Sequence, residues 1–548
     1  MKYVVPVQAA DEVSALVHAG AGELYCGYQD SWWVERYGDH DSASRRQGRA
    51  NLATLDELCG TANIAAEQGI PLYLALNARY TEPQLDYLED LCRRFWDMGG
   101  TGVIVSDLGL LWRLRDVPGL KKCLSILAVA QNVPTLKAFQ KLGVTRVVLP
   151  RFMDAPEAGA LMSAVAPMEA EVMAFFDKCP WVDGYCRHRH GVSYAPREVA
   201  RGVEAPKAAP LYTFDTTYVT HACLQKSITY IEPYPCAACF LPEYEAGGVG
   251  YAKLGGRGRL LEERLRALRF LCKSTELGSH EDRALLYQST YQKNCACYYG
   301  DALQNRSAIE AIPLPQDSRY GIVLGSQTRM HDYLRDCAKI AGGAYRDDSN
   351  GVMLCIPPLS QSDLETLINT LQTQSYNFPA RFALCVNDLG TYITCEEYAR
   401  RQFSNATSEQ SQATNTTTAS CPFVYNAKTT TEGYPLVYNA ETTTEGYPSL
   451  YNSKSFGENY SLSYYPQIEV IPGTLLSRLD DPAEVKHFLS PAENPPRPIW
   501  GPNAEPRTLT YQAPPQTLID HWTHPSFQEP SAQSALKFLL NIPQQNSR

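Results

Sequence analysis

Residues 72–109, LYLALNARYTEPQLDYLEDLCRRFWDMGGTGVIVSDLG, decide the fold class of this chain. Two short apolar runs, Leu72–Asn77 and Gly102–Val105, have the length and composition of buried strands. Between them, Thr81-x-x-Gln84 is a capping box that begins an amphipathic helix, and the Gly99-Gly100 pair ends it. A strand, a helix and a second buried strand in this order predict a right-handed βαβ unit, and hence a parallel sheet.

The same alternation extends over the first half of the chain. Asn51 is predicted to cap the helix before Leu72, and Gly69 to end it. More than four strand–helix repeats within about 150 residues favour a (β/α) TIM-type barrel over an open sheet. The other predicted strands are Tyr3–Val7, Glu23–Cys26, Ser125–Val129 and Arg146–Leu149.

Four polar side chains follow predicted strands: Asn77, Asp107, Gln131 and Arg151. In such barrels the site lies at the carboxyl ends of the strands, so these residues are expected at the mouth of the barrel. Asn77, Asp107 and Arg151 are the candidate catalytic residues. Asp107 has a second interpretation, as the N-cap of the helix that follows it.

The composition is that of a globular chain of 548 residues, with 44% hydrophobic residues and a net charge of −10. This acidic balance gives no global basic surface for nucleic acid, although a local basic patch remains possible. We find no secretory signal and no run of about 18 apolar residues that could span a bilayer. We therefore expect a cytoplasmic protein, whose seventeen cysteines serve metal or redox chemistry more than disulfides.

The chain divides into several predicted regions. Residues 1–275 form the barrel and 276–317 a connector, and a C-terminal α/β region covers 318–400 and 462–548. Residues 401–461 interrupt that region with a Thr/Asn/Tyr-rich insertion, in which a 13-residue repeat starts at Val424, Val437 and, in decayed form, Leu450. Three short copies are too few for a solenoid, so we interpret them as a duplicated surface insertion.

The C-terminal region contains its own strand and helix patterns. Ser362–Gln372 is a predicted helix, and Val386-Asn-Asp-Leu-Gly390 echoes Val105-Ser-Asp-Leu-Gly109. The echo is either coincidence or the trace of a second α/β unit of related descent. The predicted strands are Tyr320–Leu324, Val352–Ile356 and Phe382–Val386.

Five cysteines fall close together in the sequence: the pair Cys179-x6-Cys186, then Cys223, then Cys236-x2-Cys239. Clustered thiolates suit an iron–sulfur cluster or zinc, and the sequence does not separate the two metals. A basic run, Arg187–Arg201, directly follows Cys186. It is either a solvated loop or a contact for an anionic substrate. Cys295-x-Cys297 is interpreted as structural.

Eight segments in order give the first 258 residues a resemblance to peptidase family U32, the collagenase-like proteases. The last of them, Lys253-Leu-Gly-Gly-Arg257, resembles the family's Lys-Ile-Glu-Gly-Arg. The chain departs from the family pattern at Arg151-Phe152 and at Phe175-Phe176. The other matching segments are Ala19–Tyr25, Leu74–Asn77, Val103–Leu110, Gln131–Val133, Val147–Arg151, Glu171-Val172 and Cys179–Cys186.

The resemblance implies an iron–sulfur protein that supports oxygen-independent hydroxylation of an RNA base, or of a quinone-precursor ring as in ubiquinone biosynthesis. The resemblance further implies a cluster of four irons and four sulfides that is held by four cysteines: Cys179, Cys186, Cys223 and Cys236. Zinc is the alternative metal. The alternative functions are a collagenase-like endopeptidase and a non-catalytic partner of a second U32-like subunit, and the substrate is a small molecule or RNA.

The fourth ligand is the least determined of the set, because Cys239 lies on the same short segment as Cys236. The spacing to Lys253–Arg257 favours Cys236. Pro235 suits the first turn of a helix or a rigid approach to one, and on such a helix Cys239 would lie one turn further along the same side. We expect Cys236, and not Cys239, to complete the site.

Overall fold

The computed structural model describes most of residues 1–293 and parts of the chain beyond them. The described ranges are 1–38, 42–46, 48–128, 130–151, 153–176 and 234–293, followed by 296–297, 310–312, 320–324, 351–356, 359–374, 381–386, 389–395, 397–399, 401, 467–472 and 530–540. Of the strands beyond residue 293 only the backbone is described.

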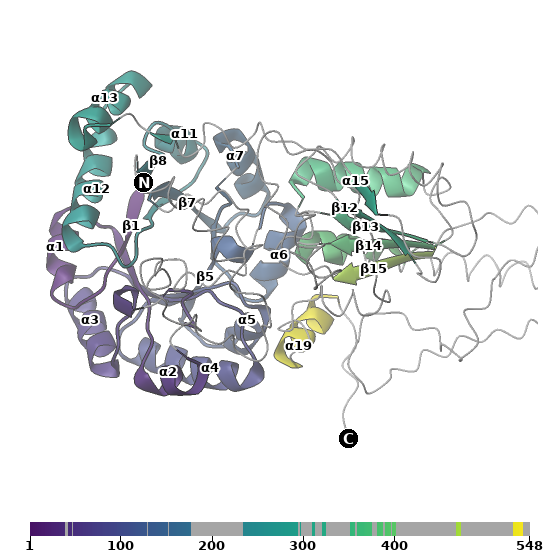
Figure 1. The fold of residues 1–548 in the computed structure, drawn as a ribbon, viewed down its shortest axis with the longest axis horizontal. Helices are drawn as coiled ribbons and strands as arrows, with labels where there is room; N and C mark the ends of the chain where they lie inside the picture. Colours follow the sequence, from purple (N-terminus) through teal and green to yellow (C-terminus); the bar gives the residue numbers. More distant parts are fainter. Residues whose placement is uncertain are drawn as a thin grey trace, which may run out of the picture.

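Eight parallel strands close into a barrel, which confirms the predicted fold class (Figure 1). Each strand pairs with the next along the chain from β1 to β7, and β9 closes the ring by pairing with both β7 and β1. The strands are β1 Lys2–Pro6, β2 Glu23–Cys26, β3 Leu72–Leu76, β4 Gly102–Val105, β5 Lys121–Leu124, β6 Arg146–Val148, β7 Glu169–Phe175 and β9 Tyr251–Leu254.

A ring of helices surrounds the barrel, and the short helix α2, Ser31–Tyr37, is inserted between β2 and the helix that leads to β3 (Figure 1). The capping box of α4 is present, because the Thr81 backbone N–H donates to Gln84 Oε1 over 2.9 Å. The ring consists of α1 Glu12–His18, α3 Leu55–Glu67, α4 Glu82–Asp97, α5 Leu108–Leu114, α6 Val133–Lys141, α7 Ala155–Ala164, α11 Leu241–Ala246, α12 Leu261–Ser274 and α13 His280–Tyr291.

Two local predictions in the barrel are wrong. The fifth strand is Lys121–Leu124, and residues 126–128 of the predicted strand form a single 3-10 turn. Two lysines interrupt the apolar run of the true strand, so the apolar pattern does not predict it. Lys122 is nevertheless buried, and its ammonium group donates to the Leu120 carbonyl. The cap of α3 is Thr54, which forms a capping box with Glu57, and not Asn51.

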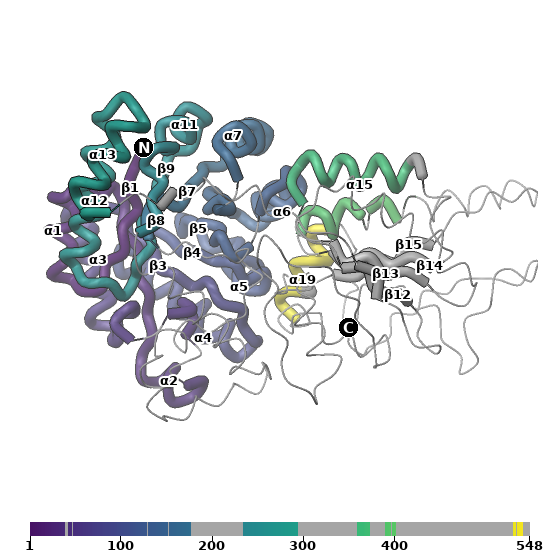
Figure 2. Tube along the Cα trace, turned by 45° about the horizontal axis from the view of Figure 1, so that its top comes forward, coloured from purple at the N-terminus to yellow at the C-terminus, as the bar shows by residue number. Residues whose placement is uncertain are grey.

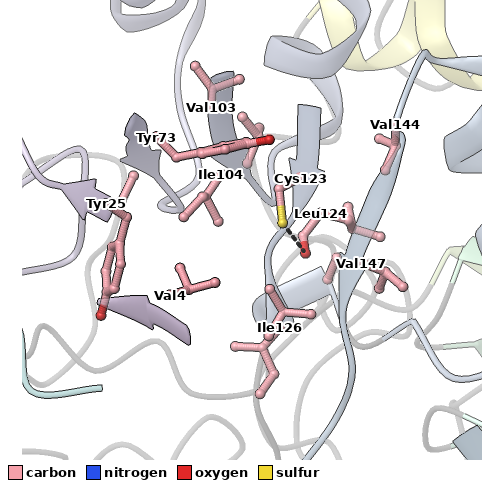
Figure 3. Packing of buried hydrophobic residues seen from close by; sticks show 14 of the residues in the cluster. Val4, Tyr25, Tyr73, Val103, Ile104, Cys123, Leu124, Ile126, Val144 and Val147 are labelled. Atoms are coloured by element: carbon pink, nitrogen blue, oxygen red, sulfur yellow. Dashed lines mark hydrogen bonds between the residues drawn. The ribbon is translucent and has the colours of Figure 1, made fainter. Parts of the chain in front are cut away.

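The interior of the barrel is filled by side chains from successive strands. Figure 3 shows Val4, Tyr25, Tyr73, Ile104 and Cys123, from five neighbouring strands, gathered in the core. All five are at most 6% exposed. The barrel is therefore packed at this level, as is usual for the fold.

Two short strands extend the sheet beside β7. Phe175 of β7 pairs antiparallel with Cys236 of β8, Pro235–Cys236, and β10, Ala296–Cys297, pairs parallel with β8. The interpretation of Pro235 and Cys236 as the first turn of a helix is therefore wrong, because both lie on β8. Pro235 is compatible with a strand of two residues, and α11 begins only at Leu241, after the turn at residues 238–240.

A second, five-stranded sheet lies beyond the barrel (Figure 1). Its strands β12, β13, β14 and β15 are parallel, and β11 joins β12 in the antiparallel sense. The three predicted strands and the predicted helix of this region are confirmed, whereas β15 was not predicted. The bounds are β11 Glu310–Ile312, β12 Tyr320–Leu324, β13 Gly351–Ile356, β14 Arg381–Val386, β15 Gln467–Pro472 and, for the helix, α15 Gln361–Gln374.

The C-terminal segments pack on the side of the barrel that carries α5 and α6 (Figure 2). Asn132, the N-cap of α6, donates from its side chain to the Leu359 carbonyl over 2.9 Å. The Gly390 N–H donates to Thr135 Oγ1 over 2.8 Å. A helix that was not predicted, α19 Pro530–Leu539, packs on α5. Both α5 and α6 begin at the face of the barrel where the strands end, so these contacts adjoin its rim.

The predicted insertion at 401–461, with its 13-residue repeats, lies outside the described residues except for residue 401. Within the part of the chain that the structure describes, no helix is long and apolar enough to cross a membrane.

Candidate functional site

Asn77 and Asp107 lie at the carboxyl ends of the adjacent strands β3 and β4, as predicted. Asp107 is the N-cap of α5: its Oδ1 accepts from the Leu110 N–H over 2.9 Å, and its Oδ2 accepts from the Tyr80 N–H over 3.3 Å. Ser106 Oγ donates to the Asn77 carbonyl over 3.1 Å, which ties the two strand ends together. The two residues therefore share one edge of the mouth.

The electrostatics of Asp107 differ from those of an exposed cap. Burial raises the pKa of this carboxyl to about 6, against the lowering effects of Arg79 and of the backbone N–H groups that it accepts. A carboxyl with such a pKa can exchange a proton near neutral pH. The two backbone hydrogen bonds that Asp107 accepts are enough to explain its position as a helix cap. The same geometry also permits a catalytic role.

The other two predicted mouth residues follow β5 and β6. Gln131 is buried beside the N-cap of α6. Arg151 lies partly buried in the turn after β6, and Phe152, the departure from the family pattern, lies outside the described residues. The structure thus brings Asn77 and Asp107 together, and places Arg151 further around the ring of strand ends.

A polar cluster that the sequence did not reveal occupies the carboxyl ends of β2 and β9. We define it as Gln29, Ser42, Ser44, Asn51 and Arg257. Ser44 Oγ donates to Asn51 Oδ1 over 2.5 Å, and Asn51 Nδ2 donates to Gln29 Oε1 over 3.1 Å. Arg257 donates to the Ser44 carbonyl over 2.6 Å. All five side chains belong to residues that are less than 10% exposed.

Gly27 provides the space for this polar cluster. A Cβ atom at position 27 would collide with Asn51 Oδ1 and would lie 2.5 Å from Arg257 Nη1 and 3.0 Å from Ser44 Oγ. The sequence indicates Arg257 only as the last residue of a family motif, and the prediction that Asn51 is a helix cap is wrong. The two residues come together because the barrel closes, and no local sequence pattern predicts that contact.

Inside the barrel, four ionised side chains form a buried network. Lys253 Nζ donates to Glu171 Oε1 over 2.8 Å, and Arg146 pairs with Glu23 over 2.6 Å and with Glu171 over 3.5 Å. Burial lowers the pKa of Lys253, but the Glu171 carboxylate, Tyr25 and Cys123 together outweigh it and the net shift is upward. Burial raises the pKa of Glu23, and Arg146 opposes that rise. The network balances two cations with two carboxylates.

Of the four predicted cluster ligands, Cys179, Cys186 and Cys223 lie outside the described residues, as does the basic run Arg187–Arg201. Cys236 is 2% exposed, and its Sγ accepts from the Ala238 N–H over 3.3 Å. Within the described ranges, no group of three or more His, Cys, Asp or Glu side chains is arranged to hold a metal ion.

The surroundings of Cys236 are aromatic. Directly opposed residues of an antiparallel pair share one face of the sheet, so Cys236 lies on the face that carries Phe175. Phe175 packs against Phe270 of α12 and Tyr291 of α13. Burial raises the pKa of the Tyr291 hydroxyl, and Cys236 contributes to that rise. The thiol thus lies in the layer between the strands and the helices, beside the mouth.

The neighbouring cysteines are placed differently. Cys239 is partly exposed, and its Sγ contacts the carbonyl of His280, the first residue of α13, at 3.8 Å. Cys297 of β10 is the register partner of Cys236 in the parallel pair. The added strands therefore bring one further cysteine of the sequence, at the level of the backbone, next to Cys236.

The sequence model of peptidase family U32 matches residues 8–205. We call this matched part of the chain the U32 region. This match covers β2 to β7 of the barrel, so the U32 region includes Asn77, Asp107, Asn51 and the segment of Cys179 and Cys186.

Curated relatives are similar to this chain over parts of their length. The tRNA hydroxylation protein P of Escherichia coli (strain K12) is 31% identical over 126 residues, which are 23% of this chain and 28% of that protein. The tRNA hydroxylation protein P1 of Bacillus subtilis (strain 168) is 24% identical over 184 residues, which are 33% of this chain and 40% of that protein. The chain therefore spans less than half of the length of either relative.

Among solved structures, the U32 peptidase Mk0906 aligns with 47% of this chain and 93% of its own, at 13% identity and a TM-score of 0.28. An oxaloacetate acetylhydrolase aligns with 50% of this chain and 83% of its own, at 13% identity and a TM-score of 0.27. Both scores are low. The barrel of the U32 region follows from its own strand pairing.

Proposed function

We propose that this chain is an iron–sulfur protein that takes part in the oxygen-independent hydroxylation of an RNA base, with tRNA as the substrate class. The observation that carries the proposal is the match of part of this chain to relatives named as tRNA hydroxylation proteins.

The chemistry of the donor set fits a cluster of this kind. Cys179, Cys186, Cys223 and Cys236 would hold it, since thiolates are the usual ligands of iron–sulfur clusters. Cys236 is buried and accepts a backbone N–H, and such hydrogen bonds to sulfur stabilise a thiolate and tune a cluster. When bound, the cluster would supply electron transfer. Zinc would use the same thiolates without redox chemistry.

The mouth of the barrel offers suitable groups for a base. Asn77 Oδ1 is buried and has no hydrogen-bond partner among the described residues, so it can accept from an exocyclic amine. The polar cluster around Arg257 supplies donors in a fixed arrangement at the ends of β2 and β9. Asp107, with a pKa of about 6, could hold or release a proton at the ring.

The decisive experiment combines metal analysis with nucleoside analysis. The full chain is purified without oxygen, and its iron, acid-labile sulfide and zinc are measured together with the ultraviolet–visible spectrum. Cells with and without the gene are compared by mass spectrometry of digested tRNA. We expect about four irons and four sulfides per chain, by analogy with common cubane clusters. We also expect one hydroxylated nucleoside that disappears with the gene.

The control is Cys59→Ala, which changes a partly exposed cysteine of α3 that is not among the proposed ligands. It should keep both iron and nucleoside, whereas Cys179→Ala and Cys186→Ala should lose both. A colourless, folded protein without iron would overturn the cluster. Cleavage of gelatin that survives both cysteine substitutions would favour the collagenase-like alternative. Loss of activity in isolation, with recovery on adding a co-purified second barrel protein, would favour the partner-subunit alternative.

A further inference from the structure

An exposed aromatic stack lies on the β2–α3 connection. Trp32 of α2 is 42% exposed, although indole rings are usually well buried. Its ring is stacked on that of Tyr87 of α4, with 4.6 Å between centroids and an interplanar angle of 6°. Tyr37 meets the edge of the same indole at 6.1 Å. One aromatic surface is thus presented to solvent with its partner rings already in place.

The carboxylate of Asp30 holds this stack in place. Asp30, the N-cap of α2, accepts from the Trp33 N–H over 2.9 Å. It also accepts from the hydroxyls of Tyr87 over 2.7 Å and Tyr28 over 3.0 Å. Trp33, the neighbour of Trp32, is only 2% exposed and anchors the helix in the core. The orientation of Trp32 is therefore fixed before any ligand arrives.

A cation accompanies the exposed ring. The guanidinium carbon of Arg36, one helical turn after Trp32, lies 5.5 Å from the indole centroid, and Arg36 is exposed. The same connection after β2 also carries Ser44 and Asn51 of the polar cluster. An aromatic face next to an arginine, on a connection that contributes to the mouth, matches a base and its phosphate.

We propose that Trp32 and Arg36 bind a nucleotide of a single-stranded RNA segment, with the base stacked on the indole and the phosphate paired with the guanidinium. This inference rests on the proposed function, because it assigns RNA as the substrate class. Most proteins that recognise an RNA sequence bind bases that are flipped or splayed out of a loop. Every base has an aromatic face that can stack on the indole. The nucleotide bound here would flank the one held in the mouth.

The test compares variants of the full chain in binding to unfractionated tRNA and to a fluorescently labelled oligoribonucleotide. Trp32→Ala should weaken binding by about 5- to 100-fold, the range expected for the loss of one base stack. Trp32→Phe should retain most of the affinity, because it keeps an aromatic face. Arg36→Ala should weaken binding and lower the slope of log affinity against log salt by about 0.7, as expected for one phosphate contact on a single strand.

Trp96→Ala is the matched control. Trp96 lies on α4, like Tyr87, and is 37% exposed, but it packs at Gly119, away from Trp32. The Trp96→Ala variant should bind RNA like the wild type. Equal binding by Trp32→Ala and the wild type would overturn this inference and leave the proposed function intact, since it would reduce the stack to a clasp between α2 and α4. An absence of RNA binding in every variant, wild type included, would instead count against the proposed function.

Discussion

Lys253 and Glu171 form a hydrogen-bonded ion pair of 2.8 Å inside the barrel, between the third residue of β9 and the third residue of β7. The pair is buried, with side chains 9% and 1% exposed, and Arg146 lies 3.5 Å from the other Glu171 oxygen. The Lys253 ammonium also lies 4.2 Å above the ring of Tyr25. A layer of charge thus occupies the barrel where branched apolar side chains are usual.

Breaking this pair from one side should be costly. Lys253→Met leaves Glu171 buried with Arg146 as its remaining cation, and should lower the free energy of unfolding by about 3 kcal/mol at neutral pH. Adding Glu171→Gln should recover part of the loss, because it removes the buried carboxylate that the single variant leaves without Lys253. Denaturant titrations at neutral pH measure this, and an equally stable single variant would contradict it.

Gly27 should tolerate no side chain. Gly27→Ala forces its Cβ against Asn51 Oδ1 and to 2.5 Å from Arg257 Nη1, so the polar cluster must open. We expect a loss of about 1–3 kcal/mol in the free energy of unfolding. Gly60→Ala is the matched control in α3: its Cβ would meet only Ala10, at 3.9 Å, and should stabilise the helix by about 0.5–1 kcal/mol. The same direction for both variants would refute the clash.

The raised pKa of Asp107 predicts a pH dependence of stability. The folded state holds the proton with a pKa of about 6, above the usual 3.8, so the contribution of Asp107 to stability declines as pH rises through this window and is constant above it. Asp107→Asn keeps an oxygen for the Leu110 N–H and removes the titration. The difference in unfolding free energy between wild type and variant should therefore change between about pH 4 and pH 6 and be flat at higher pH.

Asp154→Asn, at the exposed N-cap of α7, is the control for the loss of a capping carboxylate. If the unfolding free energies of the wild type and Asp107→Asn differ by the same amount at every pH, the assignment of a raised pKa to Asp107 is contradicted. In the nucleoside assay, Asp107→Asn also separates roles: retained hydroxylation would leave Asp107 as a cap alone, while lost hydroxylation in a stable protein would support a catalytic carboxyl.

The surroundings of Cys236 and Cys239 predict different effects on bound iron. Cys236 is buried on β8, opposite the last residue of β7, with a backbone N–H on its sulfur, whereas Cys239 is partly exposed against α13. Cys236→Ala should lose the iron bound by anaerobically purified protein, and Cys239→Ala should keep most of it. Iron analysis and the visible absorbance measure both. The opposite ranking would move the fourth ligand to Cys239.

The sequence alone determined the elements whose signals are local. The capping box at Thr81 and Gln84, the glycine pair at Gly99-Gly100 and the alternation of apolar runs with amphipathic helices predicted the barrel and the strand ends that carry Asn77 and Asp107. These patterns act within one or two turns of chain, so they are legible without tertiary structure. The same logic predicted β12, β13, β14 and α15.

Only the tertiary structure decided what depends on long-range pairing. β5 lies at Lys121–Leu124 because hydrogen bonding to β4 and β6 outweighs the polarity of two lysines, and Cys236 lies on a strand because β7 offers it an edge. Gly27 meets Arg257 because β9 closes the ring onto β1, and Trp32 meets Tyr87 because α2 folds onto α4. Such contacts join residues far apart in the chain, and their register is fixed by packing that no local pattern encodes.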